Sequence, residues 1–241
     1  MKEGKLRRRA VLWVVALGGV LITAAVITLY APWLRLFDLR ELVVTGHRYT
    51  AVEEIVRAAD LSRGQPLLSI SLRGVMTRVE TLPWIDKAEA HRSFPHTVAI
   101  TITEREAIAR LAQPDGSCLL LGTGGVILES TCDGFEAGTV VVGARTSGTC
   151  PGSVLADERV VWLIDTLHAT EFPGLNVRQI DVSDLSSVVL YAESDLRIRF
   201  GGIEHGSLRV EELLALCSTI DVSEYTSIDL RLGGEATLVP R

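Results

Sequence analysis

The 241-residue sequence lacks the short motifs that most catalytic and metal-binding sites carry. It contains no Cys-x-x-Cys, no His-Glu-x-x-His and no Gly-x-Ser-x-Gly, which argues against a redox dithiol, a zinc site and a hydrolase nucleophile. Its five histidines are scattered, with no pair at metal-ligand spacing. None of the 30 acidic residues is set apart as an acid–base pair. We therefore expect a protein that is not an enzyme and uses neither a cofactor nor a metal.

Charge is absent from one long segment near the N-terminus. Residues 10–34 contain no Asp, Glu, Lys, Arg or His, and 20 of these 25 residues are hydrophobic. A membrane-spanning helix needs about 20 apolar residues, so we expect a transmembrane helix over 11–33. A signal peptide cleaved after Ala25 or Ala31 is the alternative, but its apolar region would normally be shorter, about 7–15 residues.

The charge distribution indicates the orientation of this helix. Residues 1–35 carry six basic residues and one acidic residue, a net charge of +5. Because the whole chain has a net charge of −6, residues 36–241 have a net charge of −11. The positive-inside rule then makes residues 1–10 a cytoplasmic tail and places everything after Arg35 on the other side of the membrane. The acidic exported part argues against a nucleic-acid partner, because phosphate binding needs a basic surface.

Residues 37–111 show the pattern of a small α+β module. A strand pattern at Leu39–Thr45 is followed by two helical patterns, for which we expect Thr50 and Ser71 as N-caps. Two alternating segments then predict strands, at Trp84–Ala90 and Val98–Thr103. The order β-α-α-β-β predicts two helices packed on one face of a sheet.

Residues 112–241 are dominated by strand patterns. The glycine-rich turn Gly122–Gly125 joins two apolar segments and lacks both a following helix and a lysine, so it predicts a hairpin rather than a phosphate site. Helical spacing recurs at Glu158–Ala169 and Ser207–Cys217. We expect a mainly antiparallel β domain with flanking helices.

The four cysteines lie beyond the predicted helix, where disulfides can form. Cys217 shares a helical face with Val210 and Leu213, which predicts a buried free thiol. We expect a disulfide between Cys132 and Cys150, because it would tie down the glycine-rich segment between them. A bond between Cys118 and Cys132 is the alternative, and all four thiols stay free if the environment is reducing.

The first module resembles the POTRA domain of the FtsQ (DivIB) family of bacterial cell-division proteins. The motifs that carry the resemblance are Val44–Gly46, Gly64–Leu68, Leu82–Ile85, Arg92–Pro95 and Ile102–Arg105. The second module is similar to the β domain of the same family, through Ile180–Asp181, Arg197–Gly201 and Ile228–Arg231, whereas residues 130–160 match by position alone.

The resemblance implies where partners bind. In FtsQ proteins the C-terminal strand region of the β domain receives the FtsB–FtsL pair, by adding a strand to an exposed edge. The residues of this chain that correspond to the region are Ile228, Leu230, Leu232, Gly233, Gly234, Ala236 and Leu238. From their alternation alone, an ordinary final strand is the simpler interpretation. The POTRA strands around residues 37–46 are the second implied surface, for other division proteins.

The resemblance therefore implies a non-enzymatic scaffold of the division machinery. Such a protein would span the inner membrane once at the septum and link septal proteins, and so help to control septal peptidoglycan synthesis. Two alternatives stay open. One is a POTRA-containing component of protein transport or envelope assembly, although such proteins carry several POTRA repeats and this sequence shows one. The other is a membrane-tethered envelope enzyme.

Overall fold

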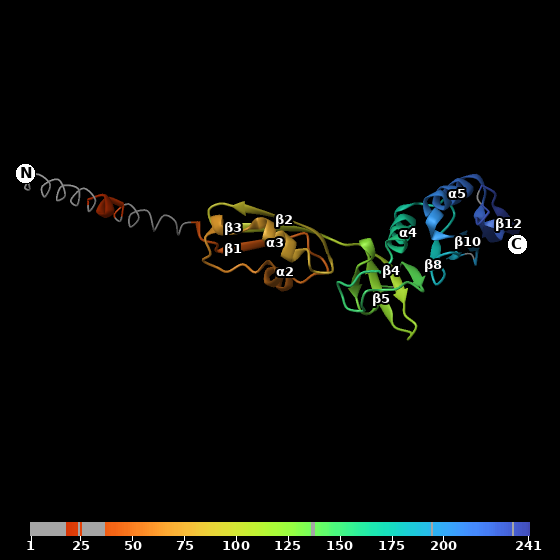
Figure 1. Ribbon diagram of the computed structural model, residues 1–241, viewed down its shortest axis with the longest axis horizontal. Helices are drawn as coiled ribbons and strands as arrows, with labels where there is room; N and C mark the ends of the chain where they lie inside the picture. The colour runs from red at the N-terminus through yellow and green to blue at the C-terminus, as the bar shows by residue number, and fades with distance from the viewer. Residues whose placement is uncertain (1–17, 24, 26–36, 136–137, 194, 233) are drawn as a thin grey trace, which may run out of the picture. The chain divides into compact units, whose positions relative to one another are not determined.

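The structure is a computed structural model that describes residues 18–23, 25, 37–135, 138–193, 195–232 and 234–241 (Figure 1). Most of the predicted cytoplasmic tail and transmembrane helix lies outside the described residues. Residues 18–23 and 25 are helical, and the Thr23 hydroxyl donates to the carbonyls of Gly19 and Val20. Within the described part of the chain, no helix is both long and apolar enough to cross a membrane.

The chain forms two compact units, which are described separately. The first contains the chain up to Glu80 together with Lys87–Thr103, and the second contains Thr81–Asp86 and Glu104–Arg241. The sequence suggests a boundary at 111/112, whereas the second unit takes up the chain again at Glu104. The reason is that residues 107–112 form a strand of the large sheet in the second unit.

The first unit has the expected element order. Its elements are β1 (Glu41–Thr45), α2 (Val52–Ala59), a short 3-10 helix (Leu67–Ser69), α3 (Leu72–Val79), β2 (Ile85–Ser93) and β3 (Thr97–Glu104). The strand order is β1-β3-β2, and β1 runs parallel to β3. The Ser71 side chain caps α3 by accepting from the Gly74 amide, as expected. The expected cap at Thr50 is wrong by one residue, because Ala51 takes the N-cap position and α2 starts at Val52.

The core of the first unit lies on one face of its sheet. In β3, Val98, Ile100 and Ile102 are buried, while the residues between them are more exposed. Successive strand residues point to opposite faces, so a single face is covered. Both helices bury apolar side chains, for example Ile55 of α2 and Val75 of α3, and therefore cover that face.

The second unit is built on a mixed sheet of nine strands in the order β12-β11-β10-β9-β8-β7-β4-β5-β6. Five of the eight pairings are antiparallel, and β4–β7, β7–β8 and β10–β11 are parallel. The elements are β4 (Ala107–Ala112), β5 (Cys118–Gly122), β6 (Ile127–Glu129), β7 (Thr139–Val142), α4 (Glu158–Ala169), β8 (Val177–Asp181), β9 (Val188–Ala192), β10 (Arg197–Gly201), α5 (Gly206–Thr219), β11 (Tyr225–Asp229) and β12 (Thr237–Pro240), with short 3-10 turns at Thr123–Gly125, Ile203–His205 and Val222–Glu224. The predicted α+β class and the predominance of antiparallel strands are confirmed.

The main core of the second unit joins the two helices to the inner face of this sheet. Leu163 of α4 and Leu213 of α5 are fully buried in one cluster with Val141, Ile180 and Ile198 of the strands. A smaller cluster contains Trp84, Leu120 and Leu128, and the rings of Trp84 and Phe135 lie 5.9 Å apart.

A disulfide closes the strand pair next to this smaller cluster, and it is not the pair that we expected. Cys118 is bonded to Cys132, with their Cα atoms 5.7 Å apart, while Cys150 is free and exposed. The prediction of Cys132–Cys150 is therefore wrong, and the alternative pairing is confirmed. The reason is the hairpin: Leu120 of β5 pairs with Glu129 of β6, so the chain after β6 returns to the start of β5. Cys217 is a buried free thiol, as predicted, and burial raises its pKa to about 11.

We expect Cys132→Ser to lower the free energy of unfolding of the second unit by about 3 kcal/mol, because the disulfide closes a loop of about 15 residues. Cys150→Ser is the matched control, since this thiol is free and exposed, and should change the stability by less than about 0.5 kcal/mol. Urea unfolding under non-reducing conditions measures both values. Equal stabilities of the two variants would contradict the prediction.

Candidate functional site

The strand β12 forms one end of the nine-stranded sheet. It pairs antiparallel with β11, through Ser227 with Val239, Ile228 with Leu238, and Asp229 with Thr237. On its other side, the sheet contains no further strand from the described residues. An edge of this kind presents unpaired backbone amides and carbonyls.

The hydrogen bonds of β12 show which backbone groups face outward. The Val239 carbonyl accepts from the Thr226 hydroxyl at 3.2 Å, and the Arg241 amide donates to the Glu224 carbonyl at 3.0 Å. The backbone groups of Val239 and Arg241 thus face β11. Because successive residues of a strand direct these groups to opposite edges, the N–H and C=O of Leu238 face the open edge. Pro240 also directs its carbonyl there and has no N–H to offer.

The structure divides the predicted partner-binding residues into two groups. Ile228 and Leu230 are 0% and 2% exposed, so their side chains belong to the core. Leu232 is 72% exposed, Leu238 is partly buried against the core, and Gly234 and Ala236 are exposed. Gly233 lies outside the described residues. The residues that a partner can touch are therefore those from 232 onward.

An ion pair on α5 holds the turn that leads into β12. The Arg209 guanidinium, with 7% of its side chain exposed, lies 2.7 Å from the Glu212 carboxylate. Arg209 also donates to the Arg231 carbonyl at 3.2 Å, and Glu212 accepts from the Gly234 amide at 3.0 Å. Burial acts to raise the pKa of Glu212, but the hydrogen bonds from Arg209 and from Gly234 together hold this pKa below its ordinary value. We call these two residues the turn clamp.

Sequence reasoning missed the turn clamp. The available signal was a charged residue on the apolar face of a helix: Arg209 precedes Val210 and Leu213, which are both buried, and Glu212 follows it by three residues. A buried arginine needs an acceptor, and this requirement points to Glu212.

A second ion pair lies at the end of β11. The Asp229 carboxylate accepts from Arg231 Nη2 at 2.6 Å and from the Arg231 backbone amide at 3.1 Å, and Arg199 Nη1 is 3.5 Å away. The hydrogen bonds from the Arg231 side chain are the main reason that the pKa of Asp229 falls to about 2. Since Asp229 pairs with Thr237, this ion pair braces the strand that supports β12.

A groove of about 330 Å³ runs between α5 and the segment before β12. Ala215, Leu216 and Leu230 give it apolar walls, while Glu212 and Glu235 add acidic groups. Together, the open edge and the groove offer backbone hydrogen bonds and adjacent apolar contact. This combination suits an extended peptide.

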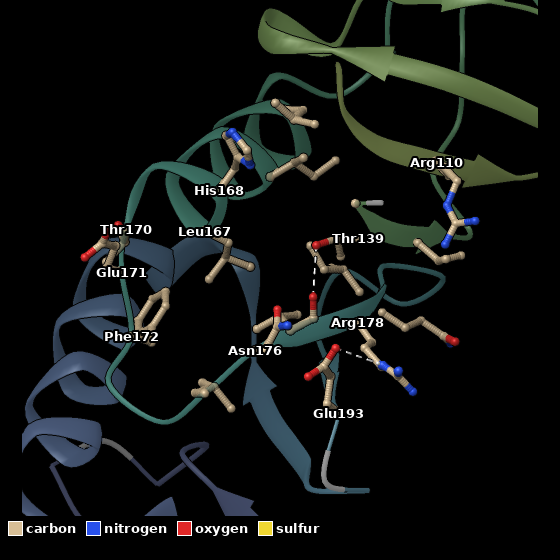
Figure 2. A pocket seen from close by; sticks show the side chains of 18 of the residues that line it. Arg110, Thr139, Leu167, His168, Thr170, Glu171, Phe172, Asn176, Arg178 and Glu193 are labelled. Atoms are coloured by element: carbon tan, nitrogen blue, oxygen red, sulfur yellow. Dashed lines mark hydrogen bonds and ion pairs between the residues drawn. The ribbon is translucent and has the colours of Figure 1, made fainter. Parts of the chain in front are cut away.

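A larger cavity of about 1190 Å³ lies between β4, β7, β8 and the C-terminal end of α4 (Figure 2). In its wall the Arg178 guanidinium lies 3.4 Å from the Glu193 carboxylate, and the His168 ring lies 3.4 Å from the Glu106 carboxylate. The Thr139 hydroxyl donates to the Val177 carbonyl at 3.0 Å, and Figure 2 shows it turned toward that strand. Among the described residues, no three His, Cys, Asp or Glu side chains form a metal-binding group.

We expect Glu212→Ala to free the turn before β12, because it leaves the Arg209 charge buried without its partner. The free energy of unfolding should fall by about 3 kcal/mol, and the amides of Gly234 and Val239, which face Glu212 and β11, should exchange hydrogen faster. Glu212→Gln keeps an acceptor for the Gly234 amide and should have a smaller effect. Unchanged exchange of these amides in the alanine variant would show that the turn clamp does not hold them.

We expect the Asp229–Arg231 pair to stabilise the second unit in a pH-dependent way. The folded pKa of about 2 lies below the ordinary value of 3.8, so the contribution is complete above about pH 4 and is lost as the pH falls through about 2. At pH 7, Asp229→Asn should cost about 1 kcal/mol, because the arginine is half exposed and screened by solvent. Urea unfolding at pH 7, 4, 3 and 2.5 measures this difference. A difference that does not shrink below pH 4 would contradict the assignment.

Comparison with known proteins points to one family. A family described as POTRA domain, FtsQ-type, matches residues 37–105. A protein of Geobacter sp. (strain M21) is 31% identical over 101 residues, which cover 41% of this chain and 35% of that protein. One of Corynebacterium glutamicum is 21% identical over 192 residues, 79% of this chain and 83% of its own. One of Mycobacterium leprae is 26% identical over 199 residues, 77% of this chain and 53% of its own.

All three relatives carry the name cell division protein FtsQ. The chain thus spans about a third of the Geobacter protein and about half of the Mycobacterium leprae protein, but most of the Corynebacterium glutamicum protein. The matched family agrees with the β-α-α-β-β order of residues 41–104. These findings confirm the resemblance to the FtsQ (DivIB) family and identify residues 37–105 as a POTRA domain of the FtsQ type.

Proposed function

We propose that this chain is a non-enzymatic scaffold of the bacterial division machinery, and that it acts by binding other proteins at the septum. In this proposal residues 11–33 span the inner membrane once, with the N-terminus in the cytoplasm and the chain after Arg35 outside. The partners are an FtsB–FtsL pair at the β12 edge and further division proteins at the POTRA domain. By holding them together, the protein would help to control septal peptidoglycan synthesis.

The open edge of β12 is the observation that carries this proposal. A partner strand that lies beside β12 can donate to the Leu238 carbonyl and accept from the Leu238 amide, because both face outward. The Pro240 carbonyl can accept one further hydrogen bond. Val239 is 48% exposed, and its side chain can contact a neighbouring residue of the added strand.

The surroundings of β12 support binding without a large rearrangement. The turn clamp and the Asp229–Arg231 pair hold β12 and its preceding turn in place without a partner. The entropic cost of ordering this segment on binding is therefore lower. The groove beside α5 supplies apolar area that backbone hydrogen bonds alone do not provide.

The POTRA domain offers a second edge. Its strand β1 lies at one end of the three-stranded sheet and exposes Val43 to 38%. An added strand can pair there by the same backbone chemistry. The proposal assigns this edge to division proteins other than the FtsB–FtsL pair.

We expect Leu238→Pro to weaken capture of the FtsB–FtsL pair at least about tenfold, because proline removes the outward amide and places its ring against the partner backbone. Proline is tolerated at an edge position whose amide faces solvent, so β12 should still pair with β11. Leu238→Ala is the matched control, since it shortens the same side chain but keeps the amide.

Binding is measured with the full chain in detergent by titration with the purified pair, and circular dichroism checks the fold of each variant. Capture by the proline variant that equals capture by the alanine variant would overturn the strand-addition mechanism. Loss of capture in both variants would show that the Leu238 side chain, rather than the backbone, makes the contact.

A further inference from the structure

Three large apolar side chains are exposed on the first unit, and one of them, Phe37, lies four residues after the end of the predicted membrane helix in the sequence. Phe37 is 39% exposed, Leu68 is 66% exposed and Phe94 is 58% exposed. We call them the apolar tip. The rings of Phe37 and Phe94 meet edge to face, with their centroids 6.0 Å apart and an angle of 82° between their planes. Single exposed apolar residues are common on proteins, but a cluster of this kind marks an interaction surface.

The topology places the apolar tip at one end of the sheet. Because β1 runs parallel to β3, the starts of both strands lie at the same end. Phe37 precedes β1, and Phe94 lies in the turn before β3. The Arg40 amide donates to the His96 carbonyl at 2.9 Å, which fastens these two segments together.

The segment that carries Leu68 is fastened to the same end. The Leu39 amide donates to the Gln65 carbonyl at 2.8 Å, and Asp38 forms a β-bridge with Pro66. Arg92 lies near the end of β2, and its Nε donates to the Leu67 carbonyl at 2.9 Å. Hydrogen bonds therefore hold the three segments that carry the apolar tip at the same end of the sheet.

The length of the connecting chain determines what this surface can reach. Only three residues separate Trp33, the last residue of the predicted membrane helix, from Phe37. Four residue steps span at most about 14 Å, which carries the chain across one polar headgroup layer of about 5–8 Å and less than about 10 Å beyond it. The end of the unit that carries the apolar tip therefore has to stay at the membrane surface. Phenylalanine and leucine side chains on membrane-surface segments are buried at the boundary between headgroups and acyl chains.

We infer that the apolar tip inserts into the interfacial layer of the lipid bilayer and makes the POTRA unit stand on the membrane by this end. The inference rests on the proposed function in one respect, the membrane anchoring by residues 11–33. It adds a consequence for partners: β1 starts at Glu41, four residues after Phe37, so its open edge begins close to the bilayer. A strand that adds to this edge has to come from a segment that lies near the membrane.

The test places a fluorescent label at the apolar tip of the full chain. In a Cys150→Ser background the remaining cysteines are a disulfide and a buried thiol, so Leu68→Cys gives one reactive position for an NBD dye. Tyr49→Cys is the matched control, because it is also exposed, at 49%, and follows the opposite end of β1. Both proteins are reconstituted into vesicles of phosphatidylethanolamine and phosphatidylglycerol that contain doxyl-labelled lipid.

We expect the lipid-borne quencher to lower the emission of the label at position 68 at least threefold more than that of the label at 49, while aqueous iodide shows the reverse order. Adding Phe94→Ser to the Leu68→Cys protein should reduce the lipid quenching. If the vesicles float with the protein but iodide reaches both labels equally, the inference is overturned and the anchoring stands.

Two other outcomes also overturn the inference. Protection of position 68 from iodide without quenching by lipid would show that another protein surface covers the apolar tip. Failure of the protein to float with vesicles would contradict the proposed anchoring itself, and the insertion of the tip with it.

Discussion

One row of apolar side chains crosses eight strands of the large sheet, and the second unit depends on it. The register places side by side, on the face that the helices cover, Leu119, Leu111, Val141, Ile180, Leu190, Ile198, Ile228 and Leu238. The first seven are at most 2% exposed. A shift of one residue in any strand would turn its member of the row to the opposite face, so burial of the row fixes the register of each strand.

Leu238, the last residue of this row, explains why β12 is held to the sheet and still has an open edge. Leu238 contributes its side chain to the core, while its backbone groups face away from β11. The Leu238 side chain thus anchors β12, while the Leu238 backbone N–H and C=O remain available for hydrogen bonding. The turn clamp adds a second constraint, because the Arg209 charge is stable in the core only with Glu212 beside it. An added strand would continue the sheet and cover what remains exposed of Leu238.

Much of the architecture could be predicted from local patterns. The helical spacing after Ser71 and the alternation in residues 98–103 both act over a few neighbouring residues, and the structure has α3 and β3 there. The same reasoning failed where distant segments decide the result. It paired Cys132 with Cys150, because it could not know that β6 returns the chain to Cys118. It also ended the first module too late, because β4 belongs to the sheet of the second unit.

The sequence by itself determined the α+β class, the order of elements in the first unit, the one long apolar segment and the imbalance of charge around it, since each follows from periodicity or composition along a short stretch. Tertiary structure alone decided which strand became the edge, which of residues 228–238 entered the core, and how Arg209 and Glu212 came to hold the final turn. The physical reason is that pairing across a sheet joins residues far apart in the chain, and so do the hydrogen bonds of Arg209 with residue 231 and of Glu212 with residue 234, so only the folded structure brings these residues together.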